Sequence, residues 1–350
     1  MNIPNSIGGY IDAGNKRLAV FGKKFNGPTA VCRYFGYGFV RIHTFFLCAM
    51  SSFRAFLIVS VFFFGGLSGL AKDIYVSQKF GDDRNSGGTA KSTDLLTGPV
   101  RTIKRALDLA ENGDRVILDP SGGPYRESIT LFGRQHSGFP NYPFIIEGQG
   151  AILDGTEPLP KGIWQHYRGD MYRFQPTMQP INFTFFHLLD NGKPLPKAAS
   201  PSELQAGEWC FFQGFVYFRA EPQKTPMSGS RYEMSYSARM TGVTLLQVSN
   251  VRIHDLTIEG FQLDGVSAVN GAQDIILDNV TCRANGRSGI TIGGASSLSA
   301  GYGTFTENLT TQVLSKPYSR GILFECDVPD NGTTSDGDEE NRTLLIKKAE

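Results

Sequence analysis

The sequence has little cysteine, little tryptophan and little charge. Its 350 residues include five cysteines and two tryptophans, and 19% of them are charged. Only Cys210, Cys282 and Cys326 follow the first 71 residues, and their spacing indicates neither a metal site nor a particular disulfide pair. We expect Cys282 to be a buried free thiol. The low charge and the 40% hydrophobic content exclude a disordered chain.

Glycine and phenylalanine are abundant, with 41 and 26 residues. Many glycines and few long helical patterns favour a turn-rich β protein. The formal net charge is +1, but residues 1–49 carry six basic residues and only one acidic residue. Residues 72–350 hold 27 Lys and Arg against 32 Asp and Glu, a net charge of −5, so no nucleic-acid partner is expected.

Residues 50–71 have the layout of a secretory signal peptide. Arg54 precedes the apolar run Ala55–Leu67, which is 13 residues long and short for a membrane span. Small residues then lead to Ala71, after which we expect cleavage. This pattern predicts a secreted, periplasmic or cell-surface protein with no stable membrane span after cleavage; an uncleaved anchor is the alternative. Residues 1–49 are interpreted as a non-native upstream extension from a mis-assigned start.

Residues 72–155 combine short strand patterns with one helix. Asp73–Ser77 alternates as a strand, and an i, i+3, i+4, i+7 apolar pattern predicts a short amphipathic helix from Ile103, Ala106, Leu107 and Ala110. The order of motifs in this segment resembles the N-terminal part of pectate-lyase-like right-handed β-helix proteins. The motifs are, in order, IYVS, a Gly/Asp/Asn-rich loop, TIxxAL, NGD, VIL and GPYRESITL. The resemblance implies that the helix caps the open end of the β-helix and that these residues form its first coils. It implies no particular activity, because enzymes of several classes share this fold.

Residues 156–240 interrupt this pattern with short aromatic strands and the turn signal Asp190-Asn191-Gly192. We interpret them as an inserted antiparallel β subdomain. Its aromatic residues form either a platform for stacking sugars or, as we favour, the core of the subdomain.

Residues 241–325 repeat with a period near 24 residues, which predicts a β-solenoid. Asp255 and Asn279 occupy the same turn position and are expected to form a polar ladder. The fold class is therefore all-β: a right-handed parallel β-helix with an N-terminal capping helix and an antiparallel insertion. One core is expected to contain Val251, Ile253, Leu256, Ile258, Ile275, Leu277, Val280 and Cys282.

The repeat fades after Asn308. Residues 319–324 predict one more strand, and residues 326–350 are interpreted as an acidic tail that is exposed or disordered. No clear C-terminal cap is recognised.

Asp264-Gly265 matches two positions of the Asn-Thr-Asp-Gly-x-Asp motif of polygalacturonases, a resemblance that would make Asp264 catalytic. One coil later, Ser288 stands where that family has histidine, so polygalacturonase activity is not expected. The alternative is that Asp264 is a structural turn residue before a strand.

Four basic residues are expected to point outward from the coils. Arg283 and Arg287 are predicted to lie near Asp264 and to complete a catalytic site, while His254 and Arg252 are candidates for substrate binding. The alternative is that all four are solvated surface charges. No metal ligands are assigned; in the related lyases Ca²⁺ often neutralises a uronate carboxylate, so calcium is a possible cofactor.

These observations predict a secreted carbohydrate-active protein whose partner is an acidic polysaccharide. Lyase chemistry is slightly favoured over glycoside hydrolysis, because arginines beside Asp264 would keep it ionised. A non-catalytic carbohydrate-binding or cell-surface solenoid is the main alternative. A structural adhesin would need longer uniform repeats.

Overall fold

The computed structural model describes residues 71–94, 96–176, 182, 184–224, 232–330, 332–335 and 343–347. The predictions for residues 1–49, and for all of the signal peptide except Ala71, lie outside these residues. Among the residues that the structure describes, no helix is long and apolar enough to cross a membrane.

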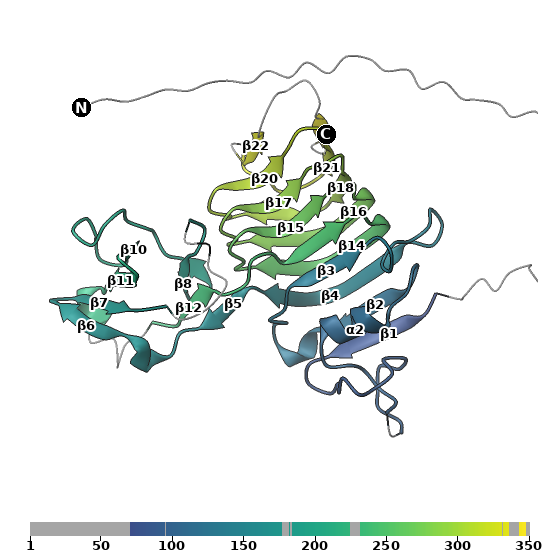
Figure 1. The fold of residues 1–350 in the computed structure, drawn as a ribbon, viewed down its shortest axis with the longest axis horizontal. Helices are drawn as coiled ribbons and strands as arrows, with labels where there is room; N and C mark the ends of the chain where they lie inside the picture. The colour runs from purple at the N-terminus through teal and green to yellow at the C-terminus, as the bar shows by residue number, and fades with distance from the viewer. Residues whose placement is uncertain are drawn as a thin grey trace, which may run out of the picture. The chain divides into compact units, whose positions relative to one another are not determined.

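The main body consists of successive coils stacked on one another, and their strands form two parallel sheets (Figure 1). One sheet contains β1 (Asp73–Ser77), β2 (Arg115–Asp119), β4 (Phe144–Asp154), β14 (Ser249–Glu259), β16 (Gln273–Arg283), β18 (Ser297–Gly301), β21 (Arg320–Phe324) and β23 (Thr343–Lys347), with β19 (Thr304–Thr306) beside β16. The other contains β3 (Ile129–Phe132), β13 (Val243–Leu246), β15 (Asp264–Val269), β17 (Ser288–Ile292), β20 (Thr311–Ser315) and β22 (Thr333–Ser335). We call them sheet A and sheet B. The predicted right-handed parallel β-helix is confirmed.

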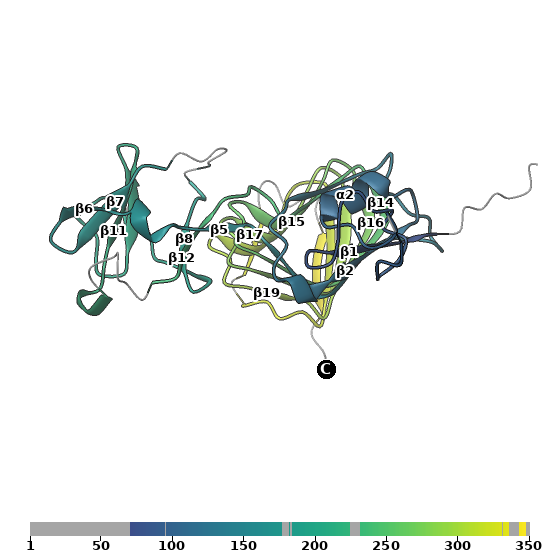
Figure 2. The same cartoon turned by 90° about the horizontal axis from the view of Figure 1, so that it is seen from below.

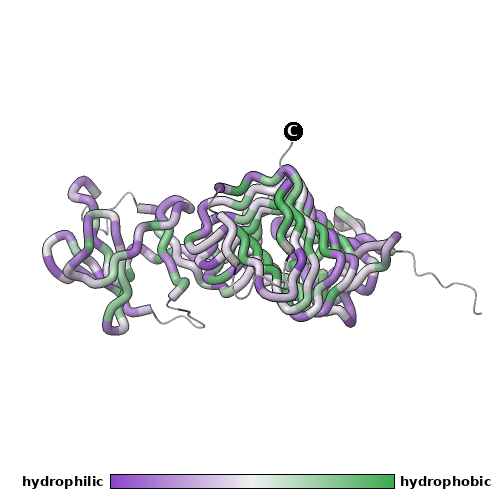
Figure 3. The backbone as a smooth tube through the Cα atoms, turned by 90° about the horizontal axis from the view of Figure 1, so that it is seen from above, coloured by the Kyte–Doolittle hydropathy of each residue, from purple (hydrophilic) through white to green (hydrophobic). Residues whose placement is uncertain are grey.

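The predicted core is also confirmed. Val251 pairs in register with Phe144 on one side and Ile275 on the other, and all eight predicted core residues are at most 2% exposed. Figure 3 shows apolar residues along the stacked strands and hydrophilic residues in many of the connecting loops. Stacking of like side chains from successive coils thus forms one continuous apolar interior.

A ladder of left-handed residues bends the long strands of sheet A. Asp255, Asn279, Tyr302 and Glu325 have φ between 50° and 53°. Asn279 Nδ2 donates a hydrogen bond of 2.6 Å to Asp255 Oδ1, which confirms the predicted polar ladder. Asn and Asp tolerate this backbone conformation better than most residues, so Asp255 and Asn279 suit the bend within β14 and β16.

Helix α2 (Ile103–Leu109) lies beside β1 and β2 at the N-terminal end of the stack (Figure 1), and Figure 2 looks onto that end. Thr102 caps it by accepting a hydrogen bond from Arg105 N, and the Glu127 carboxylate accepts bonds from the first two helical N–H groups. The four residues of its predicted apolar face are all buried. The helix prediction is confirmed. The structure also describes three short 3₁₀ helices: η1 (Pro120–Gly122), η2 (Lys161–Ile163) and η3 (Pro222–Lys224).

The insertion contains two antiparallel sheets. One consists of β6 (Gln165–Arg168), β7 (Met171–Phe174), β10 (Trp209–Phe212) and β11 (Phe215–Arg219), and the other of β5 (Thr156–Pro158), β8 (Leu188–Asp190), β9 (Lys193–Pro194) and β12 (Met234–Ser237). Asn191 and Gly192, both with positive φ, form the predicted turn between β8 and β9. Trp209, Phe174 and Phe218 are at most 1% exposed and belong to one core, as the favoured interpretation requires.

A narrow neck connects the insertion to the β-helix. The chain leaves at Gly155 and returns at Ala238, whose N–H donates to the Gly155 carbonyl at 2.9 Å. Strands β5 and β12 run antiparallel through the neck and pair Thr156 with Ser237. The two ends of the insertion therefore lie side by side.

The C-terminal region differs in part from the expectation. The strand predicted over residues 319–324 is present as β21. Within the expected tail at 326–350, however, β22 and β23 continue sheets B and A, pairing with β20 and β21. The acidic stretch between these two short strands hid their pattern in the sequence.

Candidate functional site

Asp264 is the first residue of β15 and is fully buried. Arg287 Nε lies 2.8 Å from Asp264 Oδ1 and Arg287 Nη2 lies 2.5 Å from Oδ2, which makes a bidentate pair. Ser288 Oγ donates a further bond of 2.8 Å to Oδ1. These contacts enclose the carboxylate and support a structural role at the turn. The catalytic role of Asp264 and Arg287 stays a prediction.

The other predicted site residues lie on sheet A. Arg283 is the last residue of β16, and its Nε lies 2.6 Å from Glu259 Oε2, so it pairs with Glu259 and not with Asp264 as predicted. Arg252 is exposed on β14, and His254, on the same strand, has Glu147 as a partner. The roles of these residues in catalysis and substrate binding stay predictions.

A cavity of about 390 Å³ lies where strands of sheet A meet the insertion. Its volume falls in the range of small-molecule sites. The β-helix contributes acidic and basic side chains, and the insertion contributes a lysine, aromatic rings and a glutamate. The lining includes Arg126, Asp154, Glu259, Lys161, Trp164, Tyr232 and Glu233.

Two carboxylates from neighbouring coils face this cavity. Asp154 ends β4 and Glu259 ends β14, and the two residues pair in register. Adjacent strands lie about 4.8 Å apart, so the two side chains leave the sheet next to each other. Each strand end is followed by a glycine, Gly155 or Gly260, where the chain turns from sheet A.

Arginines engage both carboxylates. Arg126 Nε lies 3.4 Å from Asp154 Oδ2, and Asp154 Oδ1 accepts a bond of 2.8 Å from Thr156 N. Arg283 pairs with Glu259 as described above. The Asp154 side chain is only 9% exposed and that of Glu259 is 23% exposed, so Glu259 is the more accessible base. The cavity thus offers carboxylate acceptors beside fixed cations.

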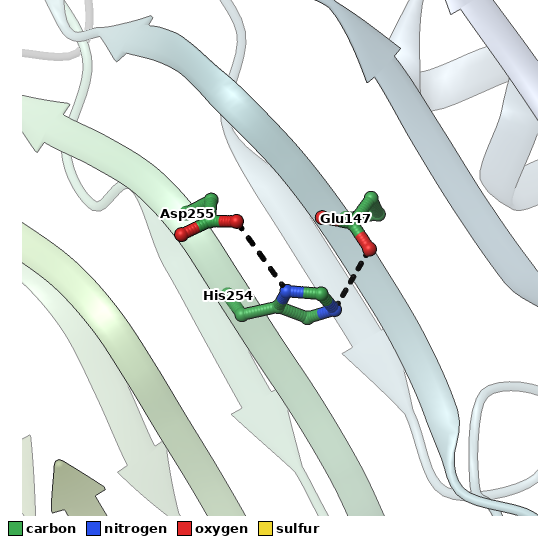
Figure 4. Close-up of side chains that lie close together, drawn as sticks. All are labelled: Glu147, His254 and Asp255. Carbon is green, nitrogen blue, oxygen red and sulfur yellow. Dashed lines mark ion pairs between the residues drawn. The ribbon is translucent and has the colours of Figure 1, made fainter.

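A second group lies on the outer face of sheet A (Figure 4). His254 Nε2 is 3.0 Å from Glu147 Oε2, and His254 Nδ1 is 3.8 Å from Asp255 Oδ2. One ligand atom from each of the three residues lies within 4.8 Å of the others, which is close enough for the group to hold a metal ion.

Sequence reasoning missed Asp154, Glu259 and Glu147. The usable signal was a similarity between FIIEGQGAILDG and NVRIHDLTIEG, in which an acidic residue and glycine end both strands. Two extra residues at the bend of β4 and the long insertion between the two segments hid this similarity. Nothing in the sequence therefore indicated that Glu147 is the acidic partner of His254.

No family model matches the chain, and no curated protein matches it. A solved structure named as a glycoside hydrolase is 13% identical, with a TM-score of 0.54 over 73% of this chain and 73% of that chain. The structure of XylC with xylose gives 11% identity and a TM-score of 0.41 over 78% and 63% of the two chains. Pectate lyase Pel9A is 12% identical, with a TM-score of 0.38 over 73% of this chain and 53% of that chain.

These neighbours are carbohydrate-active proteins by name, and at such identities the first of them shows a shared fold only. With the two parallel sheets, it confirms the fold that the N-terminal sequence resembles.

Proposed function

We propose that the protein binds an acidic polysaccharide in the cavity beside Asp154 and Glu259 and cleaves it as a lyase. The observation that carries the proposal is one cavity lined by two carboxylates, Asp154 and Glu259, and by two cationic side chains, Arg126 and Lys161. Arg126 pairs with Asp154, and Glu259 pairs with Arg283 on the next coil. Guanidinium and ammonium groups suit the carboxylate of a uronic acid. The aromatic rings of the lining suit the apolar face of a sugar.

In the proposed reaction, Arg126 and Lys161 hold the uronate carboxylate, which favours loss of the proton on the adjacent carbon. Glu259 takes this proton. The electron pair forms a carbon–carbon double bond while the glycosidic C–O bond breaks, and the leaving oxygen takes a proton from water. Hydrolysis would instead require one protonated carboxyl group, whereas both carboxylates at this cavity pair with arginines.

Calcium does not fit this cavity well. The ion takes six to eight oxygen ligands, whereas Arg126 and Arg283 already engage Asp154 and Glu259. We therefore propose that Arg126 and Lys161, and not Ca²⁺, neutralise the substrate carboxylate. Activity that disappears with a calcium-selective chelator and returns with Ca²⁺ would contradict this.

The test is a panel of acidic and neutral polysaccharides, read for ultraviolet absorbance of unsaturated ends and for reducing ends. We expect both signals with an acidic polymer, and a loss of at least about 100-fold in Glu259→Gln, the typical scale for removing a general base. Glu307→Gln changes an exposed glutamate one coil beyond Arg283 and should keep full activity.

The other outcomes decide against the proposal. Reducing ends without ultraviolet absorbance would indicate a hydrolase. Retention of the protein in gels containing an acidic polysaccharide, with no product, would indicate the non-catalytic binder.

We also propose export of the protein through the signal at residues 50–71. N-terminal sequencing of the exported protein should begin at Lys72. A mature protein that retains residues 1–49 would contradict the proposal.

A further inference from the structure

We propose that Glu147, His254 and Asp255 form a binding site for one divalent transition-metal ion of the zinc class. The site lies on the outer face of strands β4 and β14 (Figure 4), and none of its residues lines the cavity of the proposed lyase. The inference is therefore independent of the proposed function.

Strand register brings the first two ligands together. Glu147 on β4 is the in-register partner of His254 on β14, and the His254 Nε2 to Glu147 Oε2 distance is 3.0 Å. These residues are 107 positions apart in the sequence, so their contact depends on correct stacking of the coils. A metal bound here would join two neighbouring coils.

The bend of the strand supplies the third ligand. Successive residues of a regular strand point to opposite faces, but Asp255 has a φ of 52°, and this conformation breaks the alternation. Asp255 Oδ2 consequently lies 3.8 Å from His254 Nδ1, while Leu256 returns to the core. Asn279 donates to Asp255 Oδ1, which orients the carboxylate and leaves Oδ2 available, as outer-shell partners do at metal sites.

The dimensions suit a small ion. Zinc bonds to nitrogen and carboxylate oxygen are about 2.0–2.2 Å long, and one ion binds through one ring nitrogen of His254. One ligand atom from each of the three residues lies within 4.8 Å of the others, so side-chain rotations would bring the three atoms around one ion. The side chains of Glu147, His254 and Asp255 are 17%, 29% and 43% exposed. One side of the group therefore stays open to water, which would complete the coordination.

The ligand set selects the class of metal. One imidazole with two carboxylates suits zinc and its neighbours in the first transition row, whereas calcium and magnesium prefer oxygen ligands only. The competing state is a proton on His254, which would make an ordinary ion pair with Glu147. Metal and proton compete for the same ring nitrogen.

The experiment uses the full-length protein after treatment with a chelator. Titration with Zn²⁺ by calorimetry and with Co²⁺ by visible absorption should each show one equivalent bound, without the charge-transfer bands of thiolate ligands. Zn²⁺ should also raise the melting temperature, because the folded state alone assembles the three ligands. His254→Gln should weaken binding by at least about tenfold and remove the thermal shift.

His166→Gln is the matched control, since His166 is an exposed histidine of the insertion whose Nε2 contacts the Gly169 carbonyl. It should bind as wild type does. If His254→Gln does not fold, Glu147→Gln replaces it and should show the same loss. Absent binding, thiolate bands, or an equal loss in both histidine variants would overturn the proposal.

Discussion

Ile275 and Ile276 are neighbours on β16 that face opposite sides of sheet A, and together they test the register of the whole β-helix. Ile275 is 1% exposed and pairs with Val251 and Leu298. Ile276 is 37% exposed and pairs with Arg252 and Ser299. Replacing each by alanine removes the same three carbon atoms from the same strand.

The expected costs differ because only one side chain is enclosed. Removing three buried carbons from Ile275 costs about 2.4 kcal/mol of transfer free energy at roughly 0.8 kcal/mol per carbon. A cavity between coils that cannot collapse adds on the order of 1 kcal/mol, so Ile275→Ala should cost about 3–4 kcal/mol. Water fills the space that Ile276→Ala leaves, and its cost should be about 1 kcal/mol.

Urea unfolding followed by far-ultraviolet circular dichroism measures both values. The decisive quantity is the difference between the two unfolding free-energy costs, because both variants change the same strand and are measured against the same denatured state. Equal costs, or a larger cost for Ile276→Ala, would refute the register, because a slip of one residue exchanges the two faces of a strand.

Three further predictions concern charged and thiol groups. Asp264→Asn should lower the free energy of unfolding by about 3 kcal/mol in urea, because it breaks the ion pair between the buried Asp264 carboxylate and Arg287. A variant with unchanged melting but no turnover would instead support the catalytic role. The hydrogen bond from Arg115 lowers the pKa of Asp73, so this pair stabilises the protein above the ordinary aspartate pKa and loses its contribution as the pH falls through the lowered pKa. A plot of the free energy of unfolding against pH should have a smaller slope for the Asp73→Asn variant than for the wild type. An unchanged slope would contradict the assignment. Burial raises the pKa of Cys282, so iodoacetamide at pH 8 should modify the half-buried Cys326 before Cys282 in the folded protein. Peptide mapping that finds Cys282 modified equally fast would disprove this.

The sequence was sufficient for features that repeat at short range. Val251 and Ile275 are 24 residues apart with no insertion between them, so the stacking of their coils follows from the period alone. The ladder of Asp255 and Asn279 follows from the same spacing. Helix α2 was predictable because its apolar face repeats within eight residues.

The candidate sites were not predictable in this way. Glu147 and Asp154 precede the insertion, while His254 and Glu259 follow it, so no local period brings these pairs together. Arg283 and Arg287 show a different limit of sequence reasoning. The alternation of residues along a strand predicts which face a side chain lies on, but it does not predict which acidic residue that side chain pairs with. Arg283 pairs with Glu259 and Arg287 pairs with Asp264, on opposite sides of the turn that links sheet A to sheet B.

The neck at Gly155 and Ala238 has a consequence for the order of folding. Strands β4 and β14 must pair although Phe144 and Val251 are over 100 residues apart, and closing so long a loop is entropically unfavourable and slow. If the insertion folds first, the contact between Gly155 and Ala238 shortens that separation to about one ordinary coil of the β-helix. The insertion would then speed the stacking of the coils around it, and replacing it with a short turn would preserve the path of the β-helix backbone.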